Sequence, residues 1–201
     1  MKSRLFILII LTLLFGLVSC ATYKATQIVV RPIDEYTIRT KADGITCAAD
    51  PYDTPEKAKQ GFYVDTTSQG FYAINLILLN ETDDRVMILR DAVELVDSDG
   101  NAHRSVRADI MIDALESSPL AYAFFGFGIW SAMSAEEANK KMAADWRDKE
   151  IPDNMIISPG QKTNGFVYFQ LPKGKVPKGC TLRFEAEQLE SRERVPVELT
   201  L

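Results

Sequence analysis

One apolar run dominates the pattern of hydrophobic and polar positions along the chain. It extends from Phe71 to Leu79, is interrupted only by Asn75, and lies between Gly70 and Asn80. A run this short, bounded by turn-forming residues, is typical of a central strand that is covered on both faces. We therefore expect it to form the centre of the hydrophobic core.

Other segments follow the two-residue period of strands with one solvent-exposed face. In residues 182–186 and 195–201, apolar residues alternate with mostly polar or charged ones, and residues 166–171 form a second apolar run. Pro196 cannot donate to a strand ladder, which places the last strand at a sheet edge. Shorter strands are expected at 36–40, 45–48, 86–89, 93–96 and near 102–103. About seven to nine short strands with turns between them predict a mainly β fold, an antiparallel β-sandwich in one domain over residues 36–201.

A short helix is expected over residues 54–61, before the central strand. Thr54 can cap it, Pro55 suits its first position, and Gly61 suits its end.

A helical insert is predicted between the two halves of the sandwich, over residues 107–152. Residues 107–116 have helical spacing, and Ser134 and Glu137 have the spacing of a capping box that opens a second helix. Met142 and Trp146 would lie on the apolar face of that helix, which ends before Pro152.

The middle of the insert, residues 120–133, carries no charge and is rich in aromatic residues. One interpretation is a segment packed on a sheet face, where aromatic side chains bury large areas. The other is an exposed apolar patch that contacts the lipid leaflet or a protein partner. The candidate contact residues are Phe124, Phe125, Phe127 and Trp130.

The N-terminus has the pattern of a bacterial lipoprotein signal. Lys2 and Arg4 precede an apolar segment, which ends in Leu17-Val18-Ser19-Cys20. The segment is shorter than the roughly 20 residues that a membrane-spanning helix needs. The pattern predicts a signal peptide over residues 1–20, cleaved between Ser19 and Cys20, with lipid (palmitate) on Cys20. Residues 21–35 would form a tether.

Two resemblances extend this interpretation. Asn80, the Asp99-Gly100 turn, Ser158-Pro159-Gly160, residues 165–169 and Pro172 resemble the immunoglobulin-like domains of a bacterial lipoprotein family of unknown function. The resemblance implies an immunoglobulin-like β-sandwich and a role in the cell envelope, and no activity. By resemblance to enterobacterial lipoproteins, Ala21 in place of Asp allows transport to the outer membrane, facing the periplasm.

Charge and cysteine content narrow the possible partners. The full chain has a net charge of −5, and loss of Lys2 and Arg4 with the signal leaves a mature domain near −7. Nucleic-acid binding needs clustered Lys and Arg, so it is not expected. Cys47 and Cys180 remain after Cys20 is lipidated, and they are either a possible disulfide or two buried free thiols.

No motif in the sequence indicates catalysis, a metal site or a cofactor. The single histidine, His103, has no second His or Cys at ligand spacing. Asp97, Asp99 and Asn101 around Gly100 depart from a calcium loop and fit a hairpin turn better. The sequence therefore predicts a non-enzymatic, lipid-anchored envelope protein that acts as an interaction or structural module. The alternatives are an envelope protein that contacts the membrane through residues 120–133 and, less favoured, a ligand binder or enzyme with a hidden site.

Overall fold

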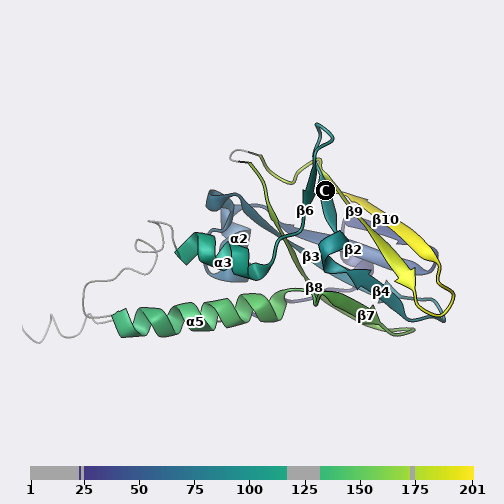
Figure 1. The fold of residues 1–201 in the computed structure, drawn as a ribbon, viewed down its shortest axis with the longest axis horizontal. Helices are drawn as coiled ribbons and strands as arrows, with labels where there is room; N and C mark the ends of the chain where they lie inside the picture. Colours follow the sequence, from purple (N-terminus) through teal and green to yellow (C-terminus); the bar gives the residue numbers. More distant parts are fainter. Residues whose placement is uncertain (1–22, 24, 117–131, 173–174) are drawn as a thin grey trace, which may run out of the picture.

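A computed structural model describes residues 23, 25–116, 132–172 and 175–201, and these residues form a mainly β fold with two antiparallel sheets (Figure 1). Sheet A has the strand order β1-β2-β3-β8. In sheet B, β9 pairs with β10 on one side and with both β4 and β5 on the other, while β7 pairs with β4 and β6 with β5. The strands are β1 (Ile38–Ala42), β2 (Ile45–Tyr52), β3 (Phe71–Asn80), β4 (Val86–Leu89), β5 (Glu94–Val96), β6 (Ala102–Arg104), β7 (Asn154–Ile157), β8 (Lys162–Gln170), β9 (Thr181–Gln188) and β10 (Arg194–Thr200).

The prediction for β3 is confirmed, because both of its faces are buried. Side chains such as Ile74 and Leu76 join the main core between the two sheets. On the opposite face of the strand, Phe71 and Ala73 lie in a second apolar cluster and Ile77 in a third. β3 pairs with β2 on one side and β8 on the other, so it is also central in sheet A.

The second cluster lies under a group of helices that we call the helical layer: α2 (Pro55–Phe62), α3 (Ala108–Glu116) and α5 (Ala132–Lys149). The three lie together at one end of the molecule (Figure 1). Met142 and Trp146 of α5 are buried there, as their helical spacing predicts. The insert is thus part of the folded domain over its described residues.

The described residues also contain three short 3-10 helices: η1 (Ile33–Glu35), η2 (Thr67–Gln69) and η3 (Arg90–Ala92).

Both predicted helix boundaries need correction. Thr54 caps α2 as expected, accepting a hydrogen bond of 3.2 Å from the Lys57 N–H. The helix continues through Gly61 and ends at Phe62, followed by the cap residue Tyr63, whose φ of 67° is left-handed. A Cβ at Gly61 would lie 2.5 Å from the Tyr52 ring, so glycine is required there for close packing on β2. Similarly, α5 begins at Ala132, which places Ser134 inside the helix instead of at its cap.

The tether predicted over residues 21–35 also needs revision. Ile28 packs against the cluster under the helical layer, and Val30 and Ile33 pack against the small cluster around Tyr36 on the outer face of sheet A. Within the described residues, this segment lies on the domain instead of extending away from it.

Candidate functional site

A groove on the outer face of sheet B is the main candidate for an interaction site. It forms because two strands share one edge of β9 but leave a gap between them. β4 pairs with residues 186–188 of β9, whereas β5 pairs with residues 181–183. Between these ladders, Phe184 and Glu185 have no strand partner on this side. The 3-10 helix η3 takes the chain around the gap from β4 to β5.

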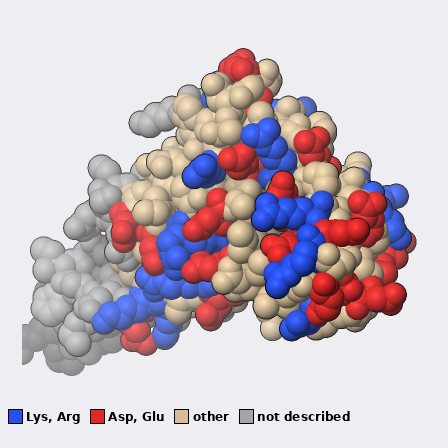
Figure 2. Space-filling model, turned by 45° about the vertical axis from the view of Figure 1, so that its right-hand side comes forward, with Lys and Arg blue, Asp and Glu red and all other residues tan. Residues whose placement is uncertain are grey.

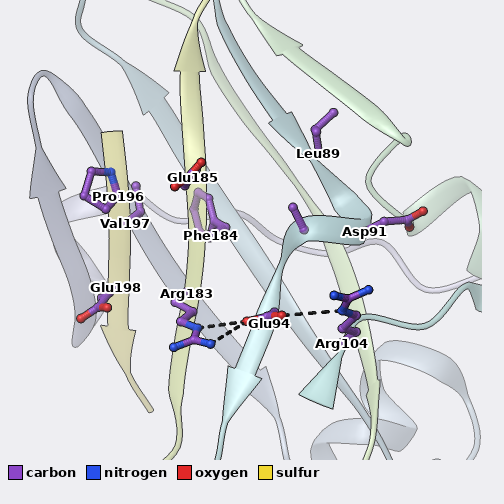
Figure 3. A pocket seen from close by; sticks show the side chains of 11 residues that line it. Leu89, Asp91, Glu94, Arg104, Arg183, Phe184, Glu185, Pro196, Val197 and Glu198 are labelled. Atoms are coloured by element: carbon purple, nitrogen blue, oxygen red, sulfur yellow. Dashed lines mark hydrogen bonds and ion pairs between the residues drawn. The ribbon is translucent and has the colours of Figure 1, made fainter. Parts of the chain in front are cut away.

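The groove has a volume of about 600 Å³ and is open to solvent (Figure 3). Leu89 and Ala92 contribute apolar surface at one rim, and Pro196 of β10 contributes it on the opposite side. The charged lining residues are Asp91, Glu94, Arg104, Arg183, Glu185 and Glu198.

Three of these six charged residues pair with one another. The Glu94 carboxylate forms ion pairs with two guanidinium groups (Figure 3). Its oxygens lie 2.8 Å from Nη2 of Arg183 and 3.7 Å from Nε of Arg104. Glu185 faces Arg194 at 3.4 Å. An open groove lined by charged and apolar side chains can contact a polar macromolecular surface.

The rim of the groove is fixed by a buried ion pair beneath η3. The Arg90 side chain is only 2 % exposed, and its Nη1 lies 3.2 Å from Oε1 of Glu150, just after α5. The same carboxylate oxygen accepts the N–H of Ala108 at the start of α3. Burial raises the pKa of the Glu150 carboxyl, although Ala108 and Arg90 act in the opposite direction. Arg90 therefore joins the groove rim to both ends of the helical insert.

The single histidine, His103, lies in β6, just after the turn that joins β5 to β6. Its Nε2 is 3.2 Å from Oδ2 of Asp97, and the other Asp97 oxygen accepts the N–H groups of Asp99 and Asn101. The Asn101 N–H and the His103 ring lower the pKa of the Asp97 carboxyl. Because Gly100 closes the turn by donating to the Asp97 carbonyl, the predicted hairpin is confirmed.

The two candidate disulfide cysteines are free thiols in the structure. Cys47 and Cys180 are both buried in the core between the sheets, and burial raises the pKa of each thiol. The possible disulfide is thus not formed, and the alternative of two buried thiols is the one observed.

The remaining predicted site residues lie outside the described part of the chain: Ser19, Cys20, Phe124, Phe125, Phe127 and Trp130. Within the described ranges, no group of three or more His, Cys, Asp or Glu side chains could hold a metal ion. Among the helices of those same ranges, none has the length and apolar character needed to cross a membrane.

Comparison with known proteins adds structural neighbours of low similarity. No protein-family model matches the chain, and no curated protein matches it. The yjhA protein from Bacillus subtilis is similar with a TM-score of 0.38 and 13% identity, covering 74% of this chain and 78% of that one. The putative ApaA protein from Bordetella pertussis is similar with a TM-score of 0.36 and 13% identity, covering 79% of this chain and 89% of that one. Similarity at this level does not carry a functional argument.

Proposed function

We propose that this protein is a lipid-anchored bacterial envelope lipoprotein, and that its domain is a non-enzymatic interaction or structural module. The observation that carries the proposal is the Leu17-Val18-Ser19-Cys20 sequence after a short apolar segment. Tyr23, three residues after Cys20, is buried in the domain, so acylated Cys20 would hold the domain close to a membrane. The finer features of the proposal are an immunoglobulin-like sandwich and an outer-membrane location facing the periplasm.

Metabolic labelling with palmitate tests the anchor. Wild-type protein is expected to incorporate the label, and the Cys20→Ser variant is expected to incorporate none. Cys47→Ala is the matched control, because Cys47 is buried and should not affect labelling. Equal labelling of wild type and the Cys20→Ser variant would refute acylation at Cys20.

The groove on sheet B supports the interaction role. Four of its lining residues are acidic and two are basic, and its paired charges and apolar rims suit a protein partner with a mixed polar surface that includes Lys or Arg side chains. A photo-crosslinking amino acid at Glu198 in the groove is expected to give one discrete product in cells. The same amino acid at Glu56, an exposed position on α2, serves as the control. Products at Glu56 but not at Glu198 would contradict a partner site in the groove.

Membrane contact through residues 120–133 is a second candidate function. It is favoured by the position of this segment between α3 and α5, the two longer helices of the helical layer. If the segment binds lipid, residues 22–201 made without lipid should sediment with neutral liposomes. Phe124→Asp should then abolish sedimentation without changing the melting temperature. If that change instead unfolds the domain, the aromatic segment belongs to the core. An enzyme or small-ligand binder remains the less favoured alternative.

A further inference from the structure

Three side chains fasten the start of the folded domain to the helical layer. The Tyr23 hydroxyl donates a hydrogen bond to Oδ2 of Asp145 on α5, and the same oxygen accepts from Nζ of Lys149. Tyr23 is 6% exposed and lies in the apolar cluster under the helices. Burial is the largest cause that raises the pKa of the Tyr23 hydroxyl, and the hydrogen bond to Asp145 is the second largest. We call Tyr23, Asp145 and Lys149 the N-terminal clasp.

The chain after the clasp has further attachments. The Thr26 hydroxyl donates to the Gly61 carbonyl of α2 at 2.6 Å, and Nζ of Lys149 donates to the same carbonyl at 2.8 Å. At the end of the segment, the Arg31 N–H donates to the Tyr36 hydroxyl at 3.1 Å. The described residues between the clasp and β1 are therefore held on the domain at several points, which limits movement of the domain relative to its N-terminal segment.

The short distance from Cys20 to the clasp limits where a lipid anchor can lie. Three residues of fully extended chain span at most about 11 Å. A lipid on Cys20 would thus enter the leaflet within about 11 Å of Tyr23, beside α2 and the C-terminal half of α5. The helical layer covers the outer face of sheet A, whereas the groove is on the outer face of sheet B.

From this geometry we infer that the surface of the helical layer faces the lipid leaflet, and that the sheet B groove faces away from it. The inference rests on the proposed lipid anchor and adds an orientation to it. The exposed face of α5 would contact the membrane, and the groove would stay accessible to a partner in the aqueous compartment.

The charge of α5 fits an anionic lipid surface better than the domain as a whole does. Its exposed residues follow a helical spacing and form a single stripe. Among the α5 residues whose exposure the structure describes, the stripe contains three basic and two acidic residues: Glu137, Lys140, Lys141, Ala144, Arg147 and Asp148. The whole mature domain, in contrast, is acidic. Figure 2 shows acidic and basic side chains interspersed over this face, with a group of acidic ones at the lower right.

Lysine footprinting tests the orientation with an internal control. Lys141 on α5 is 53% exposed and pairs with Glu137, while Lys41 on β1 is 58% exposed and pairs with Glu81. Lys41 lies at the end of sheet A opposite the helical layer. The lipidated protein would be acetylated in anionic phospholipid vesicles and in detergent, and the products compared by mass spectrometry. Acetylation of Lys141 is expected to fall severalfold in vesicles, with Lys41 unchanged.

A flexible Gly-Ser linker of about twelve residues, inserted after Ala21, perturbs the orientation without touching the fold. It would add about 19 Å of root-mean-square reach, so the protection of Lys141 should largely disappear. Equal protection of Lys41 and Lys141, or no protection of either in vesicle-bound protein, would overturn the inference.

The two proposals can fail separately. If Cys20 carries no lipid in cells, the proposed anchor fails. The orientation would still be tested by coupling Cys20 of the mature chain to a maleimide phospholipid, because Cys47 and Cys180 are buried. Protection of Lys141 in that preparation would support the geometric argument, and its absence would refute it.

Discussion

Replacement of Phe62 by alanine should reveal whether the helical layer and the sheets form one cooperative domain. Phe62 is completely buried at the end of α2, and its ring packs edge-on against four other aromatic rings. The ring centroids are 5.0 to 5.9 Å away, and the four partners are Tyr52, Trp146, Phe166 and Tyr168. These partners come from β2, α5 and β8. The Phe62 side chain therefore connects helices α2 and α5 to two strands of sheet A.

The expected loss of stability is large. Removal of a buried phenylalanine ring typically costs about 3–5 kcal/mol through lost transfer energy and the cavity left behind. Edge-on aromatic pairs add to this beyond their buried area. We expect Phe62→Ala to lower the free energy of unfolding by about 4 kcal/mol. Urea denaturation of the lipid-free domain, followed by circular dichroism, would measure the change.

Ile110→Ala on α3 is the matched control. Ile110 belongs to the same layer but is 48% exposed, so its replacement should change stability by less than about 1 kcal/mol. A loss below about 1.5 kcal/mol for Phe62→Ala would refute the packing argument. A second transition, in which helices unfold while the sheets persist, would refute the single cooperative domain.

Three further predictions concern buried charges and thiols. Arg90→Met should destabilise the domain by about 3–5 kcal/mol because it leaves the Glu150 carboxylate buried without its partner, and adding Glu150→Gln should restore part of the loss in urea denaturation. The stability lost in Asp97→Asn should be constant at neutral pH and shrink below about pH 4. The folded pKa of Asp97 is lowered, so its contribution is present above the unfolded pKa and is lost as pH falls through the folded value. Cys47 and Cys180 should react with iodoacetamide only when the protein unfolds, because both thiols are buried and burial raises their pKa.

Each of these has a contradicting result. No recovery in the double variant would mean that the Arg90 effect is unrelated to the carboxylate. A stability difference for Asp97→Asn that grows in acid would reverse the sign of the linkage. Rapid alkylation of either cysteine in native conditions would show that the core opens locally.

The strand pattern could be predicted from the sequence because it depends on local alternation and turns. The apolar run from Phe71 to Leu79 indicated a strand buried on both faces, and β3 is such a strand. Helical spacing likewise identified Met142 and Trp146 as the buried face of α5. Spacing does not show which surface a helix covers, and the contact of Trp146 with the aromatic cluster on sheet A appears only in the folded protein.

The groove and the clasp could not be predicted, because both depend on pairs of residues far apart in the chain. The groove results from the shift in register between β4 and β5 along β9, which no local pattern encodes. The clasp joins Tyr23 to Asp145 across 122 positions. The burial of Arg90 likewise depends on Glu150, which lies 60 positions further along the chain, inside the insert.

The intact mass of the N-terminal peptide, from protein isolated out of bacterial membranes, tests the lipid anchor most directly. The account predicts a peptide that begins at Cys20 and carries the additional mass of acyl chains. A peptide that retains residues before Cys20, or that begins at Cys20 without added mass, would contradict it.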